Sequence, residues 1–370
     1  MKDSRISALA DILVNYSTKV KEDDVVIIAF GVLGTPLALE ICNEVVKKGA
    51  EPFFNFVPEQ ATLDRFNYAS EEYLRKEPKM LKSIVENADV YISIYDDSNK
   101  NAFNNVNPEK IKINSQTRGP ILAPIYGKRW CAVLFPTNAY AQDSEMSLEE
   151  YEKFVFDAVL IDWENESAKW KKLEQILTNG SEVRVVGKET DLKMSIKGRI
   201  GITSNGTHNM PGGEVFISPV PDSVNGKIYF DLPAMRGKEV NDVYFEFNNG
   251  VLDNFSAGRN QDFLESMINM DKGSKRVGEF GIGTNYGIKQ FTKNILFDEK
   301  IGGTIHLALG KDFEESFPES IRSNKKELES LRNVSSLHWD FIKSLKDFGE
   351  LYVDDKLIQL NGEFIKGILG

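Results

Sequence analysis

Apolar residues in the first half of the chain follow two alternating patterns. A stripe at helical spacing that includes Leu9 and Leu13 predicts a helix over residues 3–20. The unbroken apolar run at residues 25–30 is typical of a strand that is buried on both faces. The same two patterns predict a helix over residues 36–48 and strands over residues 52–57 and 90–95. This alternation favours an α/β domain with a mainly parallel sheet and covering helices.

The pattern changes after a long helix that is expected near the middle of the chain. Ser147 and Glu150 form a capping box, and the spacing that follows predicts one helix to about Leu177. Short alternating segments then dominate, with helices expected over residues 262–269 and 324–332. The Asn-Gly pairs that favour tight hairpins begin at Asn225, Asn249 and Asn361.

This change of pattern predicts two domains with a boundary near residue 185. Residues 1–185 are expected to form the α/β domain with the mainly parallel sheet. Residues 186–370 are expected to form a strand-rich α+β domain. At 370 residues the chain is long enough for each domain to bury its own core.

A glycine-containing turn at residues 31–36 joins the first expected strand to the helix that follows it. It lacks the third glycine of a dinucleotide fingerprint and the Lys-Ser/Thr pair of a P-loop. The residues therefore favour a tight strand-to-helix turn over a nucleotide-binding loop.

Composition narrows the class of protein. The net charge of −11, with no long basic run, argues against a nucleic-acid partner. No apolar stretch approaches the roughly 18 residues that cross a bilayer, and the first residues lack the apolar core of an export signal. We therefore expect a cytoplasmic protein with no membrane partner. Cys42 and Cys131 lie in apolar contexts, which favours free thiols.

Candidate chemistry begins with the histidines, of which the chain has only three. His338 and Asp340 lie two residues apart in an expected strand, so both side chains point to one face. Leu337, Trp339 and Phe341 then point to the opposite face, toward the core. An imidazole and a carboxylate that project together suit a metal ion. A solvent-exposed histidine and aspartate would show the same pattern.

The same arrangement recurs in three further apolar segments. His306 shares its face with the small residues Thr304 and Ala308. Glu279 lies among glycines, and Glu214 enters an apolar strand directly after two glycines. Carboxylates in strands this apolar are costly unless they are paired or bind a metal. Together these segments predict a metal site, with Glu214, Glu279, His306, His338 and Asp340 as the candidate ligands.

Other residues fit catalytic schemes less well. His208 lies in a turn-rich stretch, where a solvated or locally hydrogen-bonded ring is the default, although Glu214 follows closely. The sequence contains no His-Glu-x-x-His helix, no Cys-x-x-Cys pair and no Gly-x-Ser-x-Gly elbow.

The chain resembles a known family, the aminopeptidase T-type metallopeptidases, which are dimeric bacterial and archaeal exopeptidases. The resemblance covers almost the whole length, and its most specific part is the stretch from residue 209 to residue 216. Further matching segments are residues 13–21, 135–156 and 190–192. The order Glu, Glu, His, His-x-Asp is also the ligand order of that family.

The resemblance implies two divalent ions, zinc, cobalt or manganese, held by the five candidate ligands with Glu279 as the bridge. It adds Glu299 as a further metal ligand, although the spacing from Glu299 to His306 is about two residues longer than in better-known members. It also implies that residues 186–370 form the catalytic metallopeptidase domain. A homodimer with active sites facing an enclosed space is implied as well.

One departure from the family concerns catalysis. Better-known members carry a catalytic tyrosine seven residues after the first ligand histidine, where this chain has Phe313. Another group could serve, with Tyr286 as a candidate, or a local shift could displace the match; altered activity is the third alternative.

The expected function is a metal-dependent aminopeptidase that acts on peptides with a free N-terminus, using a metal-activated water. Glu214 or Glu279 is the candidate that moves the proton of this water to the leaving amine. The alternatives are a metal-dependent hydrolase of another amide and a binding protein with a silenced site.

Overall fold

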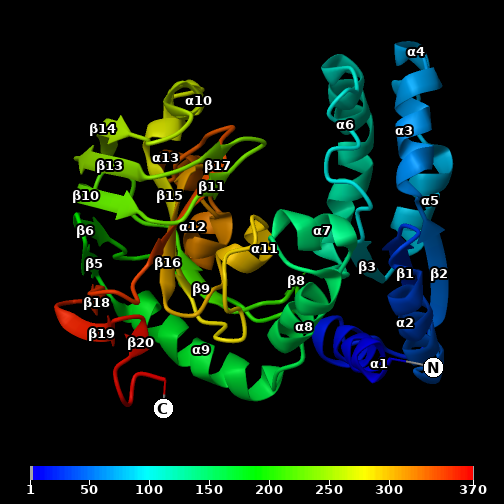
Figure 1. The fold of residues 1–370 in the computed structure, drawn as a ribbon, viewed down its shortest axis with the longest axis horizontal. Coiled ribbons are helices and arrows are strands. Elements are labelled where there is room, and N and C mark those ends of the chain that lie inside the picture. Colours follow the sequence, from blue (N-terminus) through cyan, green and yellow to red (C-terminus); the bar gives the residue numbers. More distant parts are fainter. Residues whose placement is uncertain (1–2, 370) are drawn as a thin grey trace. The chain divides into compact units, whose positions relative to one another are not determined.

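The structure is a computed structural model and describes residues 3–369. The chain forms two compact units (Figure 1). The first runs to Leu160 and includes Gly206–Pro211, and the second comprises Ile161–Asn205 and the chain from Gly212 onward. The predicted boundary near residue 185 falls within the second unit, and a division into independently folding domains at that residue stays a prediction.

A parallel sheet forms the centre of the first unit, as the sequence predicts. Its strand order is β2-β1-β3-β4-β8, and every neighbouring pair is parallel. The strands are β1 (Val25–Phe30), β2 (Glu51–Phe56), β3 (Val90–Tyr95), β4 (Arg129–Leu134) and β8 (Asn209–Met210). The apolar run that forms β1 is buried at five of its six positions, which confirms the prediction of an interior strand.

Helices surround this sheet. Those that precede β3 are α1 (Ser4–Asp11), a π-helical continuation (Ile12–Ser17), α2 (Thr35–Lys47), α3 (Glu59–Tyr68), α4 (Glu71–Leu74) and α5 (Lys79–Asn87). Those that follow it are α6 (Pro108–Leu122), a 3₁₀ turn (Ala123–Gly127), α7 (Asn138–Asp143) and α8 (Leu148–Val159). Helices α3, α4 and α6 extend beyond one end of the sheet and share a small apolar cluster around Phe66 and Ile113 (Figure 1).

The glycine turn after β1 is closed by an aspartate of its own unit. The carboxylate of Asp96 accepts hydrogen bonds from the backbone N–H groups of Gly31 at 3.0 Å and Gly34 at 2.5 Å. Burial raises the pKa of Asp96. A phosphate would need these same two donors, which Asp96 already occupies, so the contacts favour a tight strand-to-helix turn over a nucleotide-binding loop.

Antiparallel sheets dominate the second unit. The larger sheet has the order β14-β13-β10-β6-β5-β18-β19-β20, and the sheet relevant to the site has the order β17-β16-β15-β9-β7. The strands of the larger sheet are β5 (Glu182–Gly187), β6 (Thr190–Ser195), β10 (Asn225–Phe230), β13 (Val243–Asn248), β14 (Val251–Ser256), β18 (Glu350–Val353), β19 (Lys356–Leu360) and β20 (Glu363–Phe364). Strands β11 (Ala234–Met235) and β12 (Glu239–Val240) form a short ribbon.

The five-stranded sheet consists of β7 (Ile202–Ser204), β9 (Glu214–Ile217), β15 (Val277–Gly283), β16 (Thr304–Gly310) and β17 (His338–Ser344). The helices of the unit are α9 (Trp163–Asn179), α10 (Gln261–Ile268), α11 (Ile295–Asp298), α12 (Glu319–Arg322) and α13 (Lys325–Leu331), with 3₁₀ turns at Gly273–Lys275 and Glu314–Ser316. Helix α9 packs against β7 and β9. Helices α10 and α13 confirm the two helices that were predicted over residues 262–269 and 324–332. The strand-rich character of this part of the chain is confirmed as well.

Two local predictions are wrong. The single helix expected from Ser147 is broken between α8 and α9, because Leu160 leaves the helical conformation and Asp162 caps a new helix through the Asn165 N–H. Asn225 starts strand β10 instead of a hairpin turn. Asn249 and Asn361 do form the expected turns, each with a positive φ angle.

A further observation concerns membranes. Among residues 3–369, no helix combines the length and the apolar composition that crossing a bilayer requires.

Candidate metal centre

Four neighbouring strands of the five-stranded sheet bring the predicted ligands together. Strands β9, β15 and β16 contribute Glu214, Glu279 and His306 respectively, and β17 contributes His338 and Asp340. Residues directly opposite each other in antiparallel strands project from the same face. Glu279 lies opposite Ala308, which lies opposite Asp340, so both carboxylates belong to one row across the sheet. All five side chains are therefore on one face.

The opposite face of these strands forms part of the core. Ile305, Leu307 and Leu309 of β16 are each at most 1% exposed, and Trp339 and Phe341 of β17 are also buried. This confirms the alternation that was predicted from the sequence. Burial of this face fixes the register of the strands, since a shift by one residue would turn the ligands into the core.

A bulge in β15 orients Glu279. The pairing with β16 shifts between Val277 and Glu279, which leaves Gly278 as the extra residue. A side chain at Gly278 would meet the backbone oxygen of Gly310 at 2.3 Å. The bulge lets Val277 pair with Leu309, while Glu279 projects from the ligand face. Simple alternation does not predict this irregularity, although the glycine marks its position.

The carboxylate of Glu279 lies between the two imidazole rings. Its Oε1 atom is 3.4 Å from Nε2 of His306, and its Oε2 atom is 3.3 Å from Nε2 of His338. Nε2 of His306 also lies 3.5 Å from Oε2 of Glu214. Nε2 of His338 lies 3.8 Å from Oδ1 of Asp340. Each ring therefore directs one nitrogen toward two carboxylates.

These contacts define two overlapping ligand sets. Glu214, Glu279 and His306 form one, and Glu279, His338 and Asp340 form the other. Within each set the ligand atoms lie within 4.8 Å of one another. Oxygen and nitrogen atoms that converge at this spacing suit a divalent ion, with Glu279 common to both positions.

Burial increases the electrostatic interactions of the cluster. The His306 side chain is fully buried, whereas the His338 side chain is 31% exposed, so the cluster opens to solvent on the His338 side. Burial opposes protonation of both rings, yet Glu279 and Glu214 raise the pKa of His306 to about 9. Glu279 and Asp340 likewise raise the pKa of His338 to about 10. Burial opposes ionisation of Glu279, but the two imidazoles lower its pKa to about 2.

One buried atom fits a role in metal binding. Oδ1 of Asp340 has no hydrogen-bond partner among the described residues. Nδ1 of His338 lies 2.9 Å from the backbone oxygen of Lys311, a contact that keeps Nε2 directed toward the carboxylates. A metal ion would satisfy the unpaired carboxylate oxygen and would replace the protons on the two Nε2 atoms. The residues present therefore fit a divalent metal ion.

Glu299 lies beside this cluster with a lysine that the sequence analysis missed. The Lys300 ammonium contacts Oε1 of Glu299 and lies 3.3 Å from Oε1 of Glu214. Burial, followed by the charge of Glu214, raises the pKa of Glu299 to about 8. Glu299 belongs to neither ligand set, so its role as a metal ligand stays a prediction. No local pattern marks Lys300, because a lysine beside a glutamate in a turn is ordinarily solvated.

The two aromatic residues of the sequence argument differ in position. The Phe313 ring packs edge-on against His338, with ring centroids 5.2 Å apart, at the more exposed side of the cluster. It brings no hydroxyl there. The Tyr286 hydroxyl donates a hydrogen bond to the backbone oxygen of Gly362 at 2.8 Å. A catalytic role for Tyr286 would require this bond to break.

His208, the third histidine, belongs to the first unit. Its ring packs on Trp130 with centroids 5.0 Å apart, and its backbone oxygen accepts a hydrogen bond from the Ala132 N–H. This environment matches the local, structural role expected of a loop histidine.

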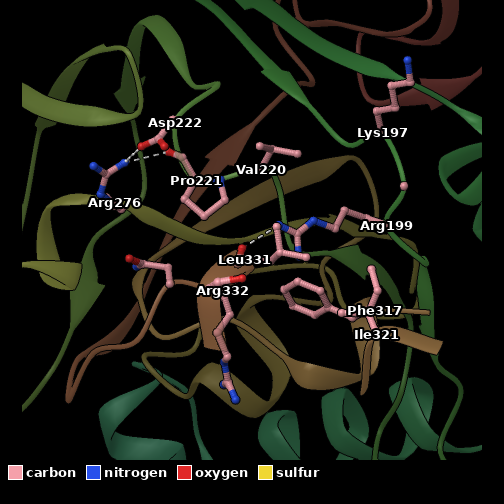
Figure 2. Close-up of a pocket in the computed structure, with 13 residues that line it drawn as sticks. Lys197, Arg199, Val220, Pro221, Asp222, Arg276, Phe317, Ile321, Leu331 and Arg332 are labelled. Atoms are coloured by element: carbon pink, nitrogen blue, oxygen red, sulfur yellow. Dashed lines mark hydrogen bonds and ion pairs between the residues drawn. The ribbon is translucent and has the colours of Figure 1, made fainter. Parts of the chain in front are cut away.

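A separate pocket of about 440 Å³ in the second unit contains none of the predicted ligands (Figure 2). At its centre the Arg199 guanidinium stacks on Phe317 at 3.8 Å and donates a hydrogen bond to the Leu331 backbone oxygen at 3.0 Å. Figure 2 shows Lys197 directed away from this group, and Arg276 paired with Asp222. The lining thus differs in chemistry from the carboxylate and imidazole cluster.

Comparisons with known proteins agree with these observations. The model of a family described as thermophilic metalloprotease (M29) matches residues 2–350. Aminopeptidase 2 of Geobacillus stearothermophilus is 23% identical over 381 residues, and the match covers 92% of this chain and 92% of that protein. Aminopeptidase T of Thermus thermophilus is 25% identical over 256 residues, which cover 59% of this chain and 62% of that protein. The solved structure of wild-type AmpT from Thermus thermophilus has the same fold, with a TM-score of 0.81, 18% identity and coverage of 98% of this chain and 99% of that one.

Proposed function

Because the chain belongs to the thermophilic metalloprotease family (M29), we propose that it is an aminopeptidase that removes single amino acids from the free N-terminus of peptides through two metal ions. The names of its relatives support the aminopeptidase activity. The observation that carries the proposal is the position of the Glu279 carboxylate, which has one oxygen near Nε2 of His306 and the other near Nε2 of His338.

The proposed centre uses each ligand set for one divalent ion. Glu214, Glu279 and His306 would hold one ion, and Glu279, His338 and Asp340 would hold the other. Carboxylate and imidazole ligands without thiolate suit zinc, cobalt and manganese alike. When bound, such ions supply a hydroxide at neutral pH and stabilise the charge that develops on the scissile carbonyl.

The side chains of the site would then orient and exchange protons. Substrate would approach from the side of His338, since that ring is partly exposed while His306 is fully buried. Glu214 or Glu279 would carry a proton from the attacking water to the leaving amine. The free α-amino group, whose recognition restricts cleavage to the N-terminus, would contact an ion or a neighbouring carboxylate. The predicted homodimer and cytoplasmic location remain predictions.

The position of Phe313 bears on the two alternative functions, a hydrolase of another amide and a binding protein with a silenced site. Because its ring packs against His338 without a hydroxyl, a different amide substrate or a silenced site would also be compatible with this position. An intact pair of ligand sets supports a functional enzyme, since a silenced site would need no such arrangement.

Product analysis tests the proposal. Metal-reconstituted protein would be incubated with a free-amine peptide, with the same peptide carrying an N-acetyl group, and with amino-acid amides, and the products would be followed by mass spectrometry. We expect stepwise loss of single N-terminal residues from the free-amine peptide and no cleavage of the N-acetylated peptide. Cleavage at internal bonds, or hydrolysis restricted to simple amides, would contradict the proposal.

A further inference from the structure

A lysine lies within the carboxylate cluster of the proposed metal centre. The Lys300 side chain is 0% exposed. Its ammonium lies 3.3 Å from Oε1 of Glu214 and contacts Oε1 of Glu299. Lysine is almost never fully buried unless it is paired, and here both partners are carboxylates. The site thus contains an ammonium group beside the carboxylates of one ligand set.

The backbone holds Lys300 in this position. Its N–H donates to the Phe297 oxygen at 3.0 Å, and its oxygen accepts from the Asn285 N–H at 3.0 Å. Gly302 N–H in turn donates to the oxygen of Asn285, at 3.0 Å. Asn285 belongs to the loop after β15, so the segment that carries Lys300 is tied to the strand that carries Glu279. The ammonium is therefore positioned by the fold and not by a flexible surface turn.

Lys300 competes with a metal ion for a carboxylate of one ligand set only, the set that contains Glu214. It faces Oε1 of Glu214, while Oε2 of Glu214 faces His306, so one oxygen of this carboxylate remains for a metal ion. A cation in that set would also lie close to the ammonium, and like charges repel in a buried site. In residues 3–369, no lysine or arginine forms an ion pair with Glu279 or Asp340 of the other set.

We propose that Lys300 is a resident cation that makes the two metal positions unequal, so that the Glu214–Glu279–His306 position binds its divalent ion more weakly than the Glu279–His338–Asp340 position. The inference rests on the proposed dinuclear centre. Glu299 then acts as the counter-ion of Lys300 and stays outside the ligand sets. Lys300 is a positioning residue, since it acts through Glu214 and Glu299 and is closed to substrate.

Calorimetry with Mn²⁺ on the metal-free full chain tests the inequality directly. We expect two binding steps whose dissociation constants differ by about tenfold or more. His306→Ala should remove the weaker step and keep the stronger one, and His338→Ala should remove the stronger step. A single detectable ion that is lost in His338→Ala and kept in His306→Ala would also support the proposal.

Substitution of the lysine tests its cause. Lys300→Met removes the charge and shortens the side chain by only its terminal atom, and we expect the weaker step to tighten by about tenfold, with little change in the stronger one. Lys343→Met is the matched control, because Lys343 is another buried lysine, bonded to the Tyr229 oxygen at 3.0 Å and outside both sets. The double variant Lys300→Met/Glu299→Gln should bind as Lys300→Met does if Glu299 is not a ligand.

The outcomes separate this inference from the proposed function. Equal steps, loss of the stronger step in His306→Ala, or weaker binding in Lys300→Met would overturn the inference and leave the metallopeptidase intact. No metal binding by the unaltered chain would overturn both. If Lys300→Met does not fold, Lys300→Gln, which also removes the charge, takes its place in the test of the cause, and the two histidine variants give the order of affinities.

Discussion

Gly281 lies directly opposite His306 in the pairing of β15 with β16, and the absence of a side chain at Gly281 leaves the space that the imidazole occupies. A Cβ atom at this position would lie 2.0 Å from Nε2 of His306. The same ring faces Glu214 and Glu279. One glycine therefore determines whether the buried histidine can reach its carboxylates.

Replacement of this glycine should disrupt the centre. Gly281→Ala forces His306 or the strand to move, so we expect a loss of about 1–3 kcal/mol in the free energy of unfolding, as for other overpacked cores. Metal bound per chain should fall as well. Urea unfolding and elemental analysis measure both quantities. Gly119→Ala in α6 is the control, because a Cβ there meets nothing within 4 Å, and helix propensity should make it neutral or stabilising.

The three histidines provide a second test with its own control. His306→Ala and His338→Ala should each reduce peptidase activity by more than about 10²-fold together with metal content, because each removes a ligand. His208→Ala should keep its metal and remain within a few-fold of the unaltered activity, since its ring packs on Trp130 in the first unit. Full activity in either of the first two variants would contradict the assigned ligands.

Metal affinity should depend on pH in a defined direction. In the metal-free protein the pKa values of about 9 for His306 and about 10 for His338 keep both rings protonated at neutral pH. Both protons must leave before Nε2 can bind a metal, so affinity should rise with pH from 6.5 toward 9. Calorimetry at neutral pH in buffers of different ionisation enthalpy should show release of about two protons. Affinity that does not change over this range would contradict these protonation states.

Substitutions at Phe313 and Tyr286 test whether a hydroxyl at the family's tyrosine position still serves catalysis or whether Tyr286 supplies it instead. If the family position still serves, Phe313→Tyr should raise kcat by about tenfold at unchanged metal content, as one added donor near the developing charge can do. Tyr286→Phe should change kcat by less than about threefold, because its hydroxyl is bonded to Gly362. Steady-state kinetics on both variants measures these changes. A large loss of kcat in Tyr286→Phe would indicate that the Tyr286 hydroxyl replaces the one that is absent at Phe313.

Local patterns were sufficient for the strands that carry the ligands. Alternation placed His306 on the face opposite to Ile305 and Leu307, and the buried run of β1 predicted an interior strand of a parallel sheet. These features depend only on which side of a strand is apolar. The resemblance to a family added the expectation that Glu279 bridges two ions, which spacing alone does not define.

Features that depend on distant contacts could not be predicted in this way. The burial of Lys300 follows from the bond of its backbone oxygen to the Asn285 N–H and from the carboxylate of Glu214, which lies far away in the sequence. The break before α9, in contrast, has a local cause, because Asp162 caps a new helix within a sequence that otherwise continues at helical spacing. Periodicity alone indicates neither feature.

The central claim is that this chain is a metal-dependent aminopeptidase. The most direct test is the initial rate of hydrolysis of a panel of aminoacyl-nitroanilides by chelator-stripped protein, with and without added cobalt, zinc or manganese. We predict release that depends on metal and on a free amine, and that is lost with N-acetylated substrates. No release with any metal, in protein that binds metal stoichiometrically, would contradict the account.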